Sequence, residues 1–452
     1  MKRLAFVMFC VVFAFISCSK DANEVIAEET GAEPSEENAG ESGTETGNET
    51  GEETGDGTFT LLGNDFQVNS YTSKNQNYPK VAVAPDGKAI VVWESDGQDN
   101  DGLAVAAQRY NSDGSKWGEE FLVNTETVST QSQPTVAVAD DGSHIIFWRS
   151  KDQDGSGFGV YAQRYDSAGN KVGNEFRINE ETNSNQDLGY AAYHSNGNVM
   201  VIWESSDQDG SAGEIYARVY DDEFNDISNG EFRVNTVIAG WQNTARIAAV
   251  PSGFIVVWES LNIDSERIAI VFKRFSSDGT PLMTMEEQVN IREICDQKNP
   301  DVAAQADGKF VIVWEHLEDP EKCSSAQTLA SDIAARMYNS DGTALTDEII
   351  VSQNTSGNQN LGITYDYRGG FVAVWQGDAS SNDSSDEIYG RRLQSTGTLN
   401  GDMFKVNSKT DSYQVFPTIG AAPDGNLLAV WGSWSGDGNG TSIRARRLKV
   451  GD

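Results

Sequence analysis

The stretch "TVAVADDGSHIIFWRSKDQDGSGFGVYAQRYDSAGNKVGNEFRIN", residues 135–179, decides the fold of this chain. It contains four short runs that are rich in Val, Ile, Phe, Tyr and Trp, and these runs are separated by Asp, Asn, Ser and Gly. Runs of this composition, bounded by turn residues, are typical of β-strands. The stretch therefore predicts one unit of four strands joined by turns and loops.

The same unit returns along the chain. Its mark is a Trp at the end of a mostly aliphatic run, found at Trp93, Trp148, Trp203, Trp258, Trp314, Trp375 and Trp431. The spacing of 55 to 61 residues lies just above the periods usual for propellers and repeat arrays. Seven four-stranded units within residues 58–452 predict an all-β fold, a seven-bladed β-propeller.

The two ends of the repeat region predict how the propeller closes. "DFQVN" at 65–69 stands alone before the first repeat, and the chain leaves on "IRARRLKV" at 443–450 without a closing strand. If "F-x-V-N" marks the outermost strand of each blade, the first copy completes the last blade and removes an open edge. The alternative is an open tandem array with a bare edge at each end.

Three recurring motifs resemble a known repeat family. "VVWES" (91–95), "YAQRY" (161–165) and "EFRIN" (175–179) are similar to the repeats W-[EQ]-S, Y-A-x-R-[YF] and F-x-V-N of bacterial secreted and surface proteins, often adhesin-like. The resemblance covers all seven repeats and implies a propeller fold, but it implies no single activity. The sequence departs from it at "FKRF" (272–275) and at Ser352, which stands where the other repeats have Asn.

The N-terminus predicts a lipid anchor. Residues 1–17 combine "MKR" with an apolar run too short to span a bilayer, which is typical of a signal peptide. "FISC" (15–18) resembles the lipobox of bacterial lipoproteins, with Phe15 in place of the usual Leu, and "CSKD" resembles a surface-export signal. We therefore expect an acylated Cys18 that anchors the protein at the outer membrane or cell surface. Ordinary secretion without a lipid is the alternative.

Composition and net charge indicate a stalk and limit the kinds of partner that the protein can bind. Residues 18–57 are Glu, Gly and Thr with few apolar side chains, which predicts a disordered acidic stalk after the lipidated Cys. The chain has 69 acidic and 33 basic residues, a net charge of −36, which argues against a nucleic-acid partner. We expect a monomeric propeller that binds a surface glycan or protein.

Connections of a four-stranded blade fall on two faces. The second-to-third and inter-blade connections share one face, which we call the long-loop face, and the short Gly-containing turns share the other. Function on a rigid scaffold concentrates where loops vary. Aromatic residues outside the repeat pattern lie on the long-loop face and are candidate ligand contacts, with loop anchoring as the alternative: Trp241, Tyr413, Phe416 and Trp434.

Acidic residues recur in the second-to-third loops of the first three blades. They are Asp99, Asp101, Asp152, Asp154, Asp207 and Asp209. Calcium prefers six to eight oxygen ligands, and the EF-hand spacing is absent here. We expect these residues to cap their own turns and we expect no cofactor, while calcium binding stays open as the alternative.

Other polar residues decide between binding and catalysis. The three histidines, His144, His194 and His316, fall in different blades. "NSDGSKW" (111–117) resembles an Asp-box but lacks one residue of it. We expect a binding module rather than an enzyme; the alternatives are a structural subunit of an envelope complex and a glycan-active hydrolase.

One further residue recurs once in every repeat. A Gln recurs in each inter-blade loop, where its amide would satisfy loop backbone groups or line a ligand channel: Gln76, Gln131, Gln186, Gln242, Gln297, Gln359 and Gln414.

Once Cys10 in the signal peptide and Cys18 are set aside, Cys295 and Cys323 remain. Both fall in long-face loops of the fifth blade, which predicts a disulfide between them.

Overall fold

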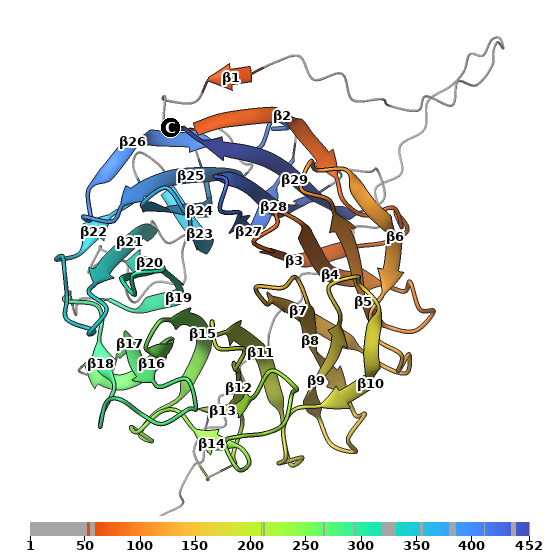
Figure 1. Ribbon diagram of the computed structural model, residues 1–452, viewed down its shortest axis with the longest axis vertical. Coiled ribbons are helices and arrows are strands. Elements are labelled where there is room, and N and C mark those ends of the chain that lie inside the picture. The colour runs from red at the N-terminus through yellow and green to blue at the C-terminus, as the bar shows by residue number, and fades with distance from the viewer. Residues whose placement is uncertain are drawn as a thin grey trace, which may run out of the picture. The chain divides into compact units, whose positions relative to one another are not determined.

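The computed structural model describes residues 52–54, 59–208, 210, 213–264, 267–292, 295–317, 331–352, 356–378, 386–410, 412–434 and 440–451. These residues form seven antiparallel sheets in a ring, and the described part of the chain contains no helix (Figure 1). The predicted seven-bladed β-propeller is therefore confirmed. No helix long and apolar enough to cross a membrane occurs among the described residues.

Each blade begins with its innermost strand and ends with its outermost strand. In order from the inside out, the blades are: one, β3 (Gln76–Val83), β4 (Ala89–Asp96), β5 (Leu103–Tyr110) and β6 (Lys116–Leu122); two, β7 (Gln131–Val138), β8 (His144–Lys151), β9 (Phe158–Tyr165) and β10 (Lys171–Arg177); three, β11 (Gln186–Tyr193), β12 (Val199–Ser205), β13 (Glu214–Tyr220) and β14 (Phe232–Arg233); four, β15 (Gln242–Val250), β16 (Gly253–Asp264), β17 (Arg267–Phe275) and β18 (Glu287–Gln288); five, β19 (Gln297–Ala304), β20 (Phe310–Leu317), β21 (Ser331–Tyr338) and β22 (Ile349–Ile350); six, β23 (Ser356–Tyr365), β24 (Gly370–Asp378), β25 (Glu387–Gln394) and β26 (Leu399–Lys405); seven, β27 (Gln414–Ala421), β28 (Asn426–Trp434), β29 (Thr441–Val450) and β2 (Phe59–Gln67).

The ends of the chain close the ring, as predicted. Strand β2 pairs antiparallel with β29, so that Phe59 lies opposite Val450 and Gln67 opposite Arg444. The short β1 (Glu52–Thr54) pairs with β2 as a fifth strand of this sheet. The remainder of the stalk expected over 18–57, and Cys18 with it, lies outside the described residues.

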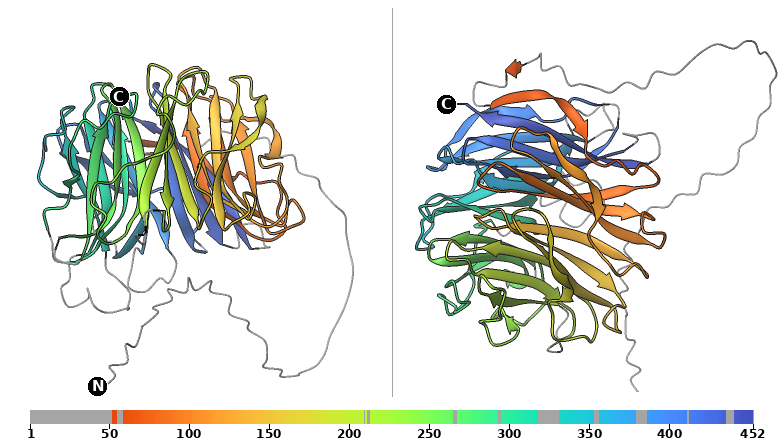
Figure 2. Two further views of the ribbon diagram at one scale, coloured as in Figure 1. Left: turned by 90° about the horizontal axis from the view of Figure 1, so that it is seen from below. Right: turned by 45° about the vertical axis from the view of Figure 1, so that its right-hand side comes forward.

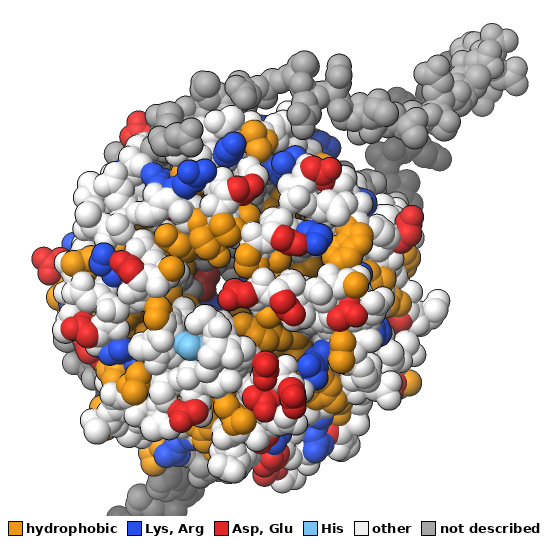
Figure 3. Space-filling view, in the orientation of Figure 1, with side chains coloured by type: hydrophobic (Ala, Val, Ile, Leu, Met, Phe, Trp, Pro, Cys, Tyr) orange, Lys and Arg blue, Asp and Glu red, His pale blue; other side chains and the backbone are white. Residues whose placement is uncertain are grey.

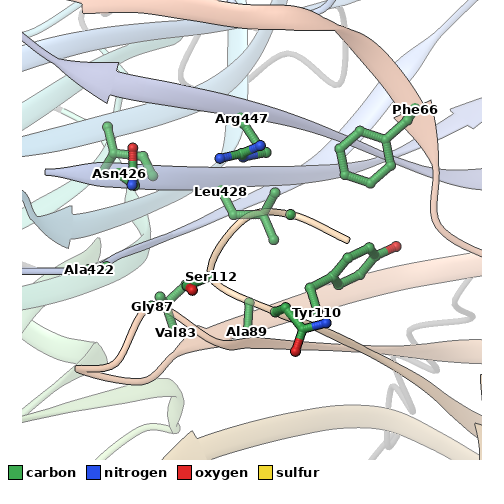
Figure 4. Close-up of a pocket in the computed structure, with 13 residues that line it drawn as sticks. Phe66, Val83, Gly87, Ala89, Tyr110, Ser112, Ala422, Asn426, Leu428 and Arg447 are labelled. Atoms are coloured by element: carbon green, nitrogen blue, oxygen red, sulfur yellow. The ribbon is translucent and has the colours of Figure 1, made fainter. Parts of the chain in front are cut away.

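The seam between blade seven and blade one is tightly packed. Figure 4 shows Phe66 and Tyr110 facing each other across this seam, and their ring centroids lie 5.8 Å apart. Arg447 donates a hydrogen bond to the carbonyl of Asp113 in blade one at 2.5 Å. The cavity left between them is only about 30 Å³, which is far below the size of a ligand pocket.

The repeated Trp residues form the core between neighbouring sheets. All seven are fully buried. Trp431 of blade seven packs against Val372 and Val374 of blade six, and Trp148 of blade two packs against Val92 of blade one. Each Trp therefore joins two blades, which explains why the same residue recurs at the same place.

The recurring Gln residues serve the structure at each blade junction. The indole Nε1 donates to the Gln Oε1 at 2.8–2.9 Å in four blades: Trp93 to Gln76, Trp258 to Gln242, Trp314 to Gln297, and Trp431 to Gln414. The amide Nε2 donates to loop carbonyls, for example Gln131 to Val128 and Gln186 to Asn183. The interpretation that these amides satisfy loop backbone groups is confirmed for five of them: Gln131, Gln186, Gln242, Gln297 and Gln414. Nε2 of Gln76 has no such partner among the described residues, and the side chain of Gln359 lies outside them.

Ser352 keeps the function of the Asn that it replaces. In the other blades the Asn of F-x-V-N accepts a hydrogen bond from the third strand, as Asn124 does from the backbone of Val105 at 2.9 Å. The hydroxyl of Ser352 accepts from the backbone of Ile333 at 3.0 Å. An oxygen acceptor at this place is therefore what the fold requires.

Candidate functional site: the central channel and its mouth

The innermost strands of all seven blades line a channel along the axis of the propeller. Figure 3 shows the short-turn face, which is hollowed at its centre, and Figure 2 shows the strands running between the two faces. The channel encloses a cavity of about 200 Å³. This is below the 300–1,000 Å³ usual for drug-sized ligands, so the cavity suits one small chemical group or a single sugar unit.

One equivalent residue from each blade contributes to this cavity. In every blade it pairs with the residue directly before the repeated Trp. We call these seven residues the channel ring: Lys80, Thr135, Tyr190, Arg246, Asp301, Gly362 and Thr418.

At the channel ring, the residue type differs from blade to blade. Trp, Gln and Asn recur because the same packing problem recurs in every blade, whereas the ring holds six different residue types. Sequence reasoning missed this ring, although a signal was present. The ring residue follows the recurring Gln by four positions in six blades and by three in blade six, and it is charged, aromatic, small or hydroxylated in turn. On a rigid scaffold, a position whose residue type varies between the repeats is a candidate for function.

The channel ring contains charged side chains next to an aromatic one. The ring of Tyr190 lies 4.1 Å from the guanidinium carbon of Arg246 and 6.0 Å from Nζ of Lys80. Burial raises the pKa of Asp301, while the positive charges of Arg246 and Lys80 act against that rise. The cavity therefore combines two cations, one buried acid and one aromatic side chain.

The inner strands bulge on the long-loop side of the ring. In six blades the residue at the bulge has a positive φ of 49–55°: Tyr78, Gln133, Thr244, Asn299, Asn360 and Phe416. This conformation is uncommon for residues other than Gly and has to be stabilised by its surroundings.

A buried carboxylate from the preceding blade stabilises four of these bulges. The backbone N–H of Gln133 donates to Glu94 at 2.7 Å, and Thr244 donates to Glu204 at 2.5 Å. Asn299 and Asn360 donate in the same way to Glu259 and Glu315, each at 2.7 Å. The acid of the W-E-S motif is thus an inter-blade hydrogen-bond acceptor.

Burial changes the protonation of these carboxyl groups. It raises the pKa of Glu94 to about 7, that of Glu204 to about 8 and that of Glu259 to about 7. Desolvation disfavours the charged form, and the single backbone hydrogen bond offsets it only in part. Near neutral pH these acids therefore hold a proton for much of the time.

Three of the four predicted aromatic residues lie in or next to the strands of blade seven and take part in two separate ring contacts. Tyr413 and Trp434 form an edge-to-face pair with centroids 5.9 Å apart, and they are 43% and 52% exposed. Phe416 contacts Tyr78 of blade one at 4.4 Å. Tyr78 and Phe416 are the bulge residues of their strands and come two positions before the channel-ring residues Lys80 and Thr418. We call Tyr78, Tyr413, Phe416 and Trp434 the aromatic ledge.

Trp241 stands apart from the ledge. It lies between blades three and four, half-buried, and its carbonyl accepts a hydrogen bond from the backbone of Leu261 at 3.0 Å. Within the described part of the chain its ring contacts none of the ledge residues. Tyr78, in contrast, was not predicted, because its role depends on the bulge.

Asp99 and Asp154 cap their own turns, whereas Asp101 accepts a hydrogen bond from the backbone of Ser129 in the following inter-blade loop at 3.0 Å. Asp99 accepts a hydrogen bond from the backbone of Asp101 at 3.2 Å, and Asp154 accepts one from Ser156 at 3.3 Å. Asp152 and Asp207 occupy positive φ angles of 60° and 58°. The described residues contain no group of three or more His, Cys, Asp or Glu that could hold a metal ion. Asp209 lies outside the described residues.

The histidines and the described cysteine lie away from the channel ring. His144 stacks on Tyr165 at 4.9 Å, and burial lowers its pKa to about 4. His316 is buried and contacts Oε1 of Gln297 through Nδ1 at 2.7 Å. Cys295 is buried and disulfide-bonded; Cys323, its predicted partner, lies outside the described residues.

Comparison with known proteins supports the fold and no more. No family model matches the chain, and no curated protein matches its sequence. A protein of unknown function from Dyadobacter fermentans is similar in structure, with 12% identity, a TM-score of 0.51, and coverage of 87% of this chain and 99% of that one. An α-L-arabinofuranosidase from Fusarium graminearum in complex with arabinobiose matches at 12% identity, TM-score 0.49, over 86% and 98%. An α-L-arabinanase from Penicillium chrysogenum matches at 13%, TM-score 0.47, over 84% and 97%.

Proposed function

We propose that this protein is an envelope-anchored module that binds a glycan at the long-loop mouth of its channel. The observation that carries the proposal is that the Tyr78–Phe416 pair of the aromatic ledge immediately precedes the channel ring on two inner strands. Tyr78 precedes Lys80 by two positions on β3, and Phe416 precedes Thr418 by two positions on β27. An extended ligand lying along the ledge would therefore place its end in the channel.

The chemistry of these two surfaces suits a sugar. The faces of a sugar ring that carry C–H bonds are apolar and pack on aromatic side chains, whereas the hydroxyl groups need hydrogen-bond partners. The ledge offers exposed aromatic surface from Tyr413 and Trp434, and the channel offers Tyr190 and Thr418 as polar partners. Aromatic anchors beside a few convergent polar groups are the usual composition of a ligand site.

The proposed location rests on the sequence alone. Cys18 after a short apolar run supports a lipid anchor, and the acidic segment up to residue 57 supports a stalk that holds the propeller away from the membrane. Such an arrangement would present the long loops to a glycan or protein at the surface.

Glycan hydrolysis is the second candidate. The observation in its favour is Glu204, whose pKa of about 8 would allow it to act as a general acid. However, Glu94, Glu259 and Glu315 make the same contact with a bulge in their own blades. A contact repeated around the ring serves the fold, and we therefore favour binding over catalysis.

A glycan array with the full-length protein tests the proposal. We expect binding to a defined set of glycans, and we expect Trp434→Ala to lower the affinity about tenfold, since truncating a central aromatic contact costs more than about 1 kcal/mol. Tyr367→Ala is the matched control, because Tyr367 is 42% exposed in a short turn between β23 and β24. Binding to no glycan would overturn the proposal, and release of reducing sugar from a bound glycan would establish the hydrolase instead.

A further inference from the structure

Two cations of the channel ring lack a carboxylate partner. Arg246 donates one hydrogen bond to the carbonyl of Ala245 at 2.9 Å and otherwise lies against the ring of Tyr190. Lys80 lies against the same ring from the opposite side of the channel. Among the described residues neither cation has a carboxylate oxygen within 4.0 Å.

The acid of the channel ring is occupied elsewhere. Oδ1 of Asp301 accepts a hydrogen bond from the backbone of Val302 at 2.9 Å, and Oδ2 accepts one from the backbone of Ile363 in blade six at 3.1 Å. Asp301 thus joins two inner strands and does not neutralise either cation by direct contact. The channel keeps an excess of positive charge whether or not Asp301 is ionised.

This excess contrasts with the charge of the whole protein. The chain carries a net charge of −36, so acidic partners are abundant. Some part-buried arginines have one, as Arg149 lies 2.8 Å from Asp187, whereas Arg336 is held by backbone carbonyls. A half-buried cation without a counter-charge loses hydration, which for Arg246 the Ala245 carbonyl and the Tyr190 ring replace only in part. Two such cations facing one cavity are arranged to bind an anion.

We propose that the group that enters the channel ring is the carboxylate of an acidic sugar, held between Lys80 and Arg246. This inference rests on the proposed function, because it takes the glycan of the ledge as the ligand. The planar guanidinium of Arg246 can hold both oxygens of a carboxylate, and Lys80 adds a point charge from the other side. The face of Tyr190 keeps the two cations in place.

A carboxylate fits better than a phosphate or sulfate. A doubly charged phosphate would lose far more hydration free energy than a singly charged carboxylate on entering this small cavity, because the cost of desolvation rises steeply with charge. The cavity of about 200 Å³ has room for one sugar unit with its carboxylate, here a uronic acid residue.

Calorimetric titration of the full-length protein with a galacturonic acid tetramer and with its methyl ester tests this inference. The two probes share the sugar backbone and the hydroxyl groups and differ in charge and in one methyl group per unit. We expect the acid to bind at least tenfold more tightly than the ester. Lys80→Gln and Arg246→Gln should each weaken binding of the acid about tenfold and weaken binding of the ester much less. Lys88→Gln is the control, because Lys88 pairs with Asp86 in a short turn at 2.5 Å; it should change neither affinity.

The outcomes separate the two proposals. Equal affinity for acid and ester would overturn the carboxylate inference and leave glycan binding intact. Competition by inorganic phosphate or sulfate as strong as that by galacturonate would overturn the preference for a carboxylate. Failure of both probes, when the array shows other glycans bound, would also refute the inference, whereas an array without any bound glycan would refute the proposed function. Melting curves of the variants confirm that each is folded.

Discussion

The carboxylate of Asp65 accepts a hydrogen bond from the backbone N–H of Ser408, 343 residues later in the chain, at 3.0 Å. The same contact recurs around the ring, where an acid on an outermost strand holds the loop that leaves the preceding blade. Glu120 does so for Ser70, and Glu175 does so for Thr125. Strand β2, the first long strand of the chain, therefore makes the same contact as the outermost strands of the other blades.

Removal of this contact should loosen the closure of the ring. Asp65 is almost fully buried and lies 3.8 Å from the buried Arg444, so Asp65→Ala leaves two backbone N–H groups and one guanidinium without their acceptor. We expect the free energy of unfolding to fall by about 2 kcal/mol. Chemical denaturation measures it, with Asp402→Ala on the exposed part of β26 as the control. Equal loss in both variants would show that the strand does not close the ring.

The buried glutamates make stability depend on pH. Glu204 has a pKa of about 8 in the folded protein against an ordinary value of 4.5, so it holds its proton more tightly when folded. The stability that this provides is complete below pH 4.5 and is lost as the pH rises through about 8. Glu94 and Glu259 act in the same direction, and His144, whose pKa is lowered to about 4, acts in the opposite direction only below pH 6.5.

We therefore expect the melting temperature to fall between pH 6.5 and pH 8.5. Glu204→Gln should flatten this fall and stabilise the protein at pH 8.5 by about 1–3 kcal/mol, since the amide oxygen still accepts from Thr244. Blade six shows that the replacement is tolerated, because Gln376 accepts from the backbone of Phe416 at 3.3 Å. A variant as sensitive to pH as the wild type would mean that Glu204 is ionised at neutral pH in the folded protein.

The predicted anchor is tested in cells. Cys18→Ala should move the protein from the membrane fraction to the soluble fraction, because acylation requires the thiol. Mass spectrometry of the wild type should show the acylated N-terminus at Cys18. Membrane retention of the variant, together with an unmodified wild type, would contradict the lipid anchor.

The disulfide partner of Cys295 is tested by digestion without reduction. We expect a peptide pair that joins Cys295 to Cys323, and we expect reduction to cost roughly 2–4 kcal/mol of stability. Both thiols alkylated without prior reduction would refute the bridge.

The fold could be predicted because its requirements repeat. A Trp that joins two blades is needed seven times, and a Gln recurs with the same period, so both are visible even in a single sequence. The Gln bonds the indole in four of the blades. The site could be predicted only in part. Tyr413, Phe416 and Trp434 are aromatic residues outside the repeat and were found, but Tyr78 gains its place from a bulge. The channel ring is recognisable only once the strand register shows which residues face the axis.

The most direct test of the central claim is the glycan affinity of a variant whose channel is filled. Thr418 lines the cavity of about 200 Å³, and Thr418→Phe places a large apolar ring in it. We expect this variant to stay folded and to lose at least about 100-fold in affinity for the glycan that the wild type binds, while Thr396→Phe, at an exposed turn on the other face, keeps full affinity. An unchanged affinity in folded Thr418→Phe would contradict the account, because the ligand would then not enter the channel.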